Sequence, residues 1–241
     1  MKLQTSSKYP NAINLIAINA RKYKADGLFH RFLPVLAALA MAGCSSLPDK
    51  PTRTVMYDFG PGSMTAQPTT RQAPLPPIAV DDITTAGGAL DNMSVLYRLN
   101  YLDGQQLRAY AQARWSTPPA QLVRPRLRDQ LGKRRTLFNA GDSAALNRSQ
   151  NANLPLLLRL ELEEFSHFFS SPDVSVGLIR MRATLVDVTP TGEKLVGQRS
   201  VIVQRPATSS DAAGGVRALT MATDAAIEEI NQWLQQTPAR P

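Results

Sequence analysis

The sequence predicts an α+β domain in which a mainly antiparallel sheet of hairpins carries two helices packed on one face. Segments with alternating apolar and polar residues recur along the chain, which is typical of half-buried antiparallel strands; the longest are Leu156–Phe165, Leu178–Val188 and Leu195–Arg205. Two other segments repeat apolar residues at helical spacing, near residues 119–132 and 216–234. Strands that bury one face need helices to cover it, so the two patterns together predict a two-layer domain.

The clearest predicted hairpin lies between residues 95 and 115. Tyr97 and Tyr101 fall on one face of an alternating run, and a second alternating run leads from Leu107 to Trp115. Between the runs stands Asp103-Gly104, and Asp-Gly favours a tight two-residue hairpin turn because both residues tolerate positive φ. The sequence therefore predicts two antiparallel strands joined at this dipeptide.

The second predicted hairpin joins Leu178–Val188 to Leu195–Arg205. The intervening segment 189–192 reads Thr-Pro-Thr-Gly, which suits a type I turn with proline at its second position and glycine at its fourth. Shorter strands are predicted at Val55–Phe59, at Ile78–Ile83 and at Leu137–Phe138.

Two amphipathic helices complete the predicted domain. Thr117 precedes two prolines and fits the N-cap of the first helix, with proline at the first helical position, where its missing N–H costs nothing. The apolar stripe of this helix ends near Gly132 and consists of Ala120, Val123, Leu127 and Leu131. The second helix ends before Pro238, and its stripe consists of Val216, Leu219, Thr223, Ile227, Ile230 and Leu234.

Cys44, the only cysteine, ends a pattern typical of a bacterial lipoprotein signal. A basic segment precedes an uncharged run from Phe32 to Ala42, and Ala-Gly stands directly before the cysteine. Basic, apolar and small-residue regions in this order mark a secretory leader. An uncleaved anchor helix is the alternative, but crossing a hydrocarbon core of about 30 Å takes about 20 apolar residues, and this run is shorter. We therefore expect Cys44 to be acylated and to become the mature N-terminus.

Cleavage at this point would define the organisation of the chain. Residues 1–43 would be removed, 44–54 would form a tether and 55–237 a single α+β domain, with a proline-rich loop at about 61–77. The removed leader holds six Lys and Arg and one Asp, so the net charge of +8 for the whole chain falls to +3 for the mature protein. The high pI gives little support for nucleic-acid binding, and we expect none.

The residues available for catalysis are few. With Cys44 acylated, the mature chain has no free thiol, and His167 is its only histidine. A catalytic triad or a metal site needs more convergent ligands. Glu161 and Glu163 alternate onto the solvated face of their strand, where salt bridges are the ordinary use of carboxylates. We expect no catalytic residue, no metal, no cofactor beyond the covalent lipid, and no enzyme activity.

Two further features favour structural interpretations. The basic cluster from Arg124 to Arg135 could bind anionic headgroups or an acidic partner, but a solvated helix face is the simpler reading. Trp115 and Trp233 lie on apolar stripes and are more simply core residues than recognition anchors.

The order of these features resembles the ABC-type transport auxiliary lipoproteins, the PqiC/YmbA-like group. The resemblance rests on the lipobox at Cys44, a short tyrosine-containing strand, Tyr97-Arg98, and the segment from Leu107 to Pro119, which contains Arg114-Trp115 followed by Ser-Thr-Pro-Pro. It extends over residues 53–236. In this family a tyrosine-bearing hairpin leads into an Arg-Trp strand end and then into a proline-started helix, which makes Tyr97, Arg114 and Trp115 candidate binding or structural residues.

The resemblance implies an outer-membrane lipoprotein that faces the periplasm, anchored by acyl chains such as palmitate on Cys44. Ser45 after the cysteine, where aspartate favours inner-membrane retention, implies sorting to the outer membrane. The implied partners are an MCE-domain protein and the ABC permease and ATPase of the same system, which moves phospholipid or other hydrophobic molecules between membranes and supports envelope integrity. The resemblance also implies that copies can assemble as a homo-oligomeric ring.

Two other functions remain as alternatives. A monomeric periplasmic lipid carrier would bind an acyl chain in its own cavity of several hundred Å³. The low aromatic content, 6%, and the ordinary strand alternation favour a filled core instead. An envelope hydrolase is disfavoured by the scarcity of histidine and cysteine.

Overall fold

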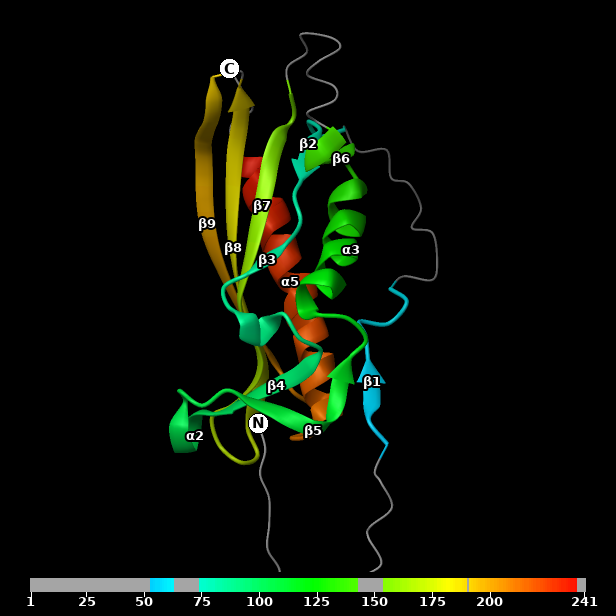
Figure 1. The fold of residues 1–241 in the computed structure, drawn as a ribbon, viewed down its shortest axis with the longest axis vertical. Helices are drawn as coiled ribbons and strands as arrows, with labels where there is room; N and C mark the ends of the chain where they lie inside the picture. Colours follow the sequence, from blue (N-terminus) through cyan, green and yellow to red (C-terminus); the bar gives the residue numbers. More distant parts are fainter. Residues whose placement is uncertain (1–52, 63–73, 143–153, 190, 238–241) are drawn as a thin grey trace, which may run out of the picture. The chain divides into compact units, whose positions relative to one another are not determined.

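A computed structural model describes residues 53–62, 74–142, 154–189 and 191–237. Nine strands within these residues form one mixed sheet, so the domain is α+β as predicted (Figure 1). The strands are β1 (Val55–Tyr57), β2 (Ile78–Val80), β3 (Thr84–Thr85), β4 (Ser94–Leu99), β5 (Arg108–Trp115), β6 (Leu137–Asn139), β7 (Leu156–Phe169), β8 (Ser175–Thr189) and β9 (Gly192–Pro206). The helices are the 3₁₀ turn η1 (Gly88–Leu90), the short α2 (Asn100–Asp103), α3 (Pro119–Gly132) and α5 (Ala212–Gln236).

The predicted predominance of antiparallel hairpins is wrong in part, because three short strands pair in parallel with β7 on one side. The strands β2, β3 and β4 follow one another beside β7, with Ile78 opposite Leu156, Thr84 opposite Glu161, and Tyr97 opposite His167. Residues 78–99 thus behave as one interrupted strand. Parallel pairing requires a long crossover, and the chain between β4 and β7, which includes α3, provides it.

The long hairpin predicted in the C-terminal half is confirmed. β8 pairs antiparallel with β7 on one side and with β9 on the other, and the β8–β9 pairing runs from Thr189–Gly192 to Val176–Pro206. The type I turn between them includes Pro190, which lies outside the described residues, so its type stays a prediction.

The hairpin between β4 and β5 is confirmed, but its predicted turn was wrong. β4 ends at Leu99, and the chain then forms the short helix α2 instead of continuing as a strand through Tyr101. Gly104 has φ −68°, so the Asp-Gly pair does not form the positive-φ turn. The Asp103 carboxylate instead accepts a hydrogen bond from the backbone N–H of Gln105 (2.9 Å), which closes the helical turn locally.

Both predicted long helices are present. In α3 the residues Val123, Leu127 and Leu131 are buried, and every residue of the predicted α5 stripe is buried. Pro119 occupies the first turn of α3, as expected, but the predicted cap was wrong: Pro118 is the N-cap residue, and no side chain caps this end. The Asp211 carboxylate caps α5 by accepting from the N–H of Gly214 (2.7 Å).

Two glycines allow α5 to lie very close to the sheet. A Cβ on Gly177 of β8 would overlap the backbone of Ala218 and Leu219, and it would lie only 2.7 Å from the carbonyl oxygen of Ala218. A Cβ on Gly215 of α5 would overlap the His167 ring and lie 2.9 Å from its Cβ. Glycine is required at both positions because backbone or ring atoms occupy the space of a side chain.

The core lies between the sheet and the two long helices. Its largest fully buried side chains include Trp115, Phe165, Leu127, Met181 and Ile227. The short strand predicted at Val55–Phe59 ends earlier, at Tyr57, and Phe59 turns into this core instead. The leader, Cys44 and most of the tether and proline-rich loop lie outside the described residues. In the described part of the chain, none of the helices combines the length and the apolar character that a membrane span requires.

Candidate functional site

The predicted site residues belong to two separate aromatic clusters. Trp115, at the end of β5, is fully buried and packs against Phe59 with ring centroids 5.7 Å apart in an edge-to-face arrangement. Tyr97, on β4, instead packs against Tyr110 at 4.6 Å and Phe169 at 6.4 Å. The structure therefore does not bring Tyr97 and Trp115 into one site.

The Arg114 side chain forms hydrogen bonds with the backbone of its own strand, β5. Its guanidinium Nη1 donates to the backbone carbonyls of Tyr110 (2.6 Å) and Ala113 (2.9 Å). Adjacent to it, Trp115 fills the core. These contacts are structural, and the role of the Arg-Trp pair in binding stays a prediction.

Much of the basic cluster on α3 has partners within the domain. Arg124 pairs with Asp82 (2.5 Å), and Arg126 pairs with Asp224 on α5 (3.5 Å). Arg126 also donates to the Phe59 carbonyl, and its guanidinium lies 6.0 Å from the centre of the Phe59 ring. These arginines tie α3 to its neighbours, which favours the structural interpretation of the cluster.

A buried polar chain connects three strands beneath α5. The His167 ring is fully buried, with Nδ1 2.9 Å from the Tyr110 hydroxyl and Nε2 2.8 Å from the Ser175 hydroxyl. Burial lowers the pKa of His167 to about 4, although the charge of Asp211 opposes the shift. Burial, with the nearby Tyr97, also raises the pKa of Tyr110 above its ordinary value. At neutral pH the imidazole is therefore uncharged, with one nitrogen donating and the other accepting.

The Ser175–His167 pair has the residue types of a nucleophile and its base, but a substrate cannot reach it. Ser175 is 6% exposed, and His167 is covered by the first turn of α5 at Gly215. A nucleophile must be accessible to the group that it attacks. The pair is better explained as hydrogen bonding between β7, β8 and β5, in agreement with the non-catalytic interpretation of His167.

The sequence pattern does not predict this buried chain of hydrogen bonds. Phe165, His167 and Phe169 alternate along β7, and all three are buried. The two phenylalanines flanking His167 at a spacing of two were the available signal that the histidine points inward. Nothing in the sequence singled out Tyr110 as its partner.

We predict that His167 makes the domain less stable in mild acid. The folded-state pKa of about 4 lies below the ordinary value near 6.5, so between these pH values the unfolded chain binds a proton that the folded chain does not. This contribution to stability is complete above about pH 6.5 and is lost as the pH falls to 4, a loss of about 3 kcal/mol. Urea unfolding between pH 4 and 7 measures it.

The control for this prediction is His167→Gln. The glutamine amide can still form hydrogen bonds in place of the imidazole, but it does not bind a proton between pH 4 and 7. Carboxylates titrate at the acidic end in both proteins, so the measured quantity is the difference between the two stability curves. If that difference stays constant from pH 4 to 7, the histidine does not carry the effect.

A second polar cluster fixes the connection between β4 and β5. Arg98 forms a two-pronged ion pair with Glu164 of β7, through Nε–Oε1 and Nη2–Oε2, both at 3.0 Å. Its remaining Nη1 donates to the carbonyls of Gly104 (3.2 Å) and Gln105 (3.3 Å). Two-pronged arginine–carboxylate pairs add geometric specificity. Arg98 therefore holds the turn after α2 against the sheet.

This ordered turn presents exposed apolar side chains. Leu102 is 66% exposed and Tyr101 40%, both on α2, and Val174 is 58% exposed in the turn between β7 and β8. Because β4 and β7 are parallel and end together, with Leu99 opposite Phe169, the segments that follow them emerge at the same end of the sheet. We call Tyr101, Leu102 and Val174 the apolar tip.

Residues 53–62, 74–142, 154–189 and 191–237 contain no group of three or more His, Cys, Asp or Glu side chains that could hold a metal ion.

The fold and these clusters define an α+β module whose described polar groups serve mainly structural hydrogen bonds and ion pairs. A family model described as "ABC-type transport auxiliary lipoprotein component" matches residues 57–231, more than half of the chain. The chain belongs to this family of transport auxiliary lipoproteins, which is not a class of enzymes. A comparison with curated proteins finds no match.

Solved structures share the fold at low sequence identity. A Xanthomonas campestris protein assigned to family model DUF330 is 15% identical, with a TM-score of 0.59 over 76% of this chain and 96% of that chain. An uncharacterized protein is 12% identical, with a TM-score of 0.51 over 76% of this chain and 99% of that one. At these identities the likeness shows the fold alone.

Proposed function

We propose that this protein is an outer-membrane lipoprotein subunit of an MCE-type ABC transport system. It would dock or scaffold the traffic of phospholipid or other hydrophobic molecules between the membranes, without catalysing a reaction itself. The observation that carries the proposal is the family match over residues 57–231 together with the lipobox at Cys44. The structural use of Arg114, Arg126 and His167 described above agrees with a non-catalytic role.

The anchor is tested by removing its attachment point. Cys44→Ala is expected to remove the protein from the outer-membrane fraction, because a chain without acyl groups loses the buried methylenes that hold it, worth about 0.8 kcal/mol each. Ser46→Ala is the matched control and should remain membrane-bound. Fractionation of both variants measures the effect, and a Cys44→Ala protein that stays with the outer membrane would rule out the anchor.

The outer-membrane assignment needs a separate variant. Ser45→Asp is expected to shift the protein from outer to inner membrane in a sucrose gradient without releasing it. An unchanged position in the gradient would contradict sorting by this residue.

The transport assignment is tested by the partners that the protein captures. Purification of the full-length lipoprotein in mild detergent is expected to recover an MCE-domain protein or the permease. Recovery of neither would contradict the proposal. The homo-oligomeric ring also stays a prediction, and native mass spectrometry of the same preparation measures the number of copies.

A further inference from the structure

The apolar tip is unusual in being both exposed and held in place. Single exposed leucines are common on protein surfaces, but here three large apolar side chains emerge at one end of the sheet. The turn that carries two of them is fixed by the contacts of Arg98 with Glu164, Gly104 and Gln105. The side chains are thus presented on an ordered element.

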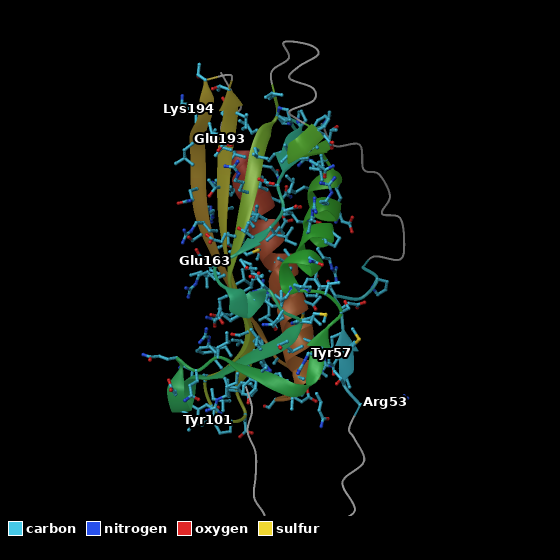
Figure 2. All side chains as sticks on the ribbon, viewed as in Figure 1. Arg53, Tyr57, Tyr101, Glu163, Glu193 and Lys194 are labelled. Carbon is cyan, nitrogen blue, oxygen red and sulfur yellow. The ribbon has the colours of Figure 1, made fainter. Side chains whose placement is uncertain are left out.

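The attachment of the chain indicates what faces this end. Arg53, the first described residue, follows Cys44 by nine residues, which span at most about 30 Å when fully extended. Figure 2 shows Arg53 and Tyr101 toward the same, lower end of the unit Thr52–Pro241, whereas Lys194 in the β8–β9 hairpin lies at the opposite end. A lipid on Cys44 would therefore hold this end near the membrane.

We propose that the apolar tip inserts into the interfacial layer of the bilayer that holds the acyl chains of Cys44. The inference rests on the proposed lipidation. Tyrosine suits this layer because its ring is apolar and its hydroxyl is polar, and Leu102 and Val174 add apolar area for burial.

Charge contributes less than apolar burial. Arg108 and the exposed Arg205 lie on strand ends near the tip, where Tyr97 pairs with Arg108 and Gly177 pairs with Arg205. Both could meet lipid phosphates, but Asp103 and Asp173 flank the same end. The consequence of a second contact is orientational: a tether alone leaves the domain free to rotate, whereas the tip would fix which end faces the membrane.

The test uses full-length lipidated protein reconstituted into vesicles of phosphatidylethanolamine and phosphatidylglycerol. Leu102→Cys is labelled with a nitrobenzoxadiazole thiol probe, and quenching by nitroxide-labelled lipids is measured. Leu195→Cys is the matched control, since Leu195 is 61% exposed, similar to Leu102, and lies beside Lys194 at the opposite end. We expect several-fold stronger quenching at position 102 than at position 195.

Equal quenching at the two positions would overturn the proposal. A blue-shifted probe at position 102 that nitroxide lipids do not quench would also overturn it, because it would place the tip against protein, such as a second copy of this chain.

Failure of the anchor is recognised separately. If Cys44 is not acylated, the unmutated protein does not float with the vesicles and its Cys44 thiol reacts with the probe, in which case the anchor and the tip proposal both fail. If the unmutated protein floats and does not label, but position 102 is not quenched, only the tip proposal fails.

Discussion

Gly177→Ala is expected to destabilise the domain by about 3 kcal/mol, the upper end of the usual cost of overpacking, because the added methyl group has no room. It would overlap backbone atoms of Ala218 and Leu219 in α5, and a helix backbone cannot move aside as a flexible side chain can. To remove this overlap, α5 must move away from β8, which would weaken the packing of its buried side chains, including Leu219 and Ile227. Urea unfolding of the variant measures the loss.

Gly197→Ala is the matched control for this prediction. Gly197 lies in the neighbouring strand β9, opposite Leu185, and a Cβ there would meet only the Trp233 ring edge at 3.4 Å. We expect a change below about 1 kcal/mol, since alanine removes the entropy disadvantage of glycine in a strand. Equal destabilisation by the two variants would show that strand disruption, and not the close approach of α5, is responsible.

The sequence was sufficient for elements whose pattern is local. The strands β7, β8 and β9 and the helices α3 and α5 follow directly from apolar periodicity, because each element buries one face against the same core. The stripe from Val216 to Leu234 extends over enough turns that no strand could bury the same residues. These elements define the two-layer α+β class.

The parallel pairing of residues 78–99 with β7 was beyond such patterns. β2 has three residues and β3 two, and neither shows enough alternation to indicate its neighbour. Their partner residues lie 78 (156 − 78) and 77 (161 − 84) positions later in the chain, so the pairing depends on how the crossover packs. The predicted Asp-Gly turn after β4 is wrong for a related reason. Arg98 forms an ion pair with Glu164 of β7, and this tertiary contact favours a helical turn over the local Asp-Gly preference.

The candidate residues also fall into those predictable from a local pattern and those that require the tertiary structure. The burial of Trp115 followed from its place on an apolar stripe, whereas the link between His167, Tyr110 and Ser175 joins three strands and required the fold. The sequence pattern also fails to indicate the apolar tip, because it predicts a strand through Tyr101 and Leu102, in which one of the two would face the core. Only the helical turn exposes both.

Trp115→Ala is expected to cost about 3 to 5 kcal/mol of folding stability, the range for truncating a large buried aromatic side chain. The indole is fully buried between Phe59 and Phe165, with ring centroids at 5.7 and 5.6 Å. Its removal leaves a cavity where the end of β5 meets the core, directly before α3. Chemical denaturation of the purified variant measures the loss.

Trp115→Phe separates packing from recognition. Phenylalanine retains much of the aromatic contact with Phe59 and Phe165 and removes the indole Nε1, which is buried without a hydrogen-bond partner among the described residues. An unpaired buried N–H is itself unfavourable, so we expect a loss of only about 1 to 2 kcal/mol. Because the ring is inaccessible, capture of an MCE-domain partner by this variant should match that of the unmutated protein. A stable Trp115→Phe protein that no longer captures its partner would show instead that the Arg-Trp motif serves recognition.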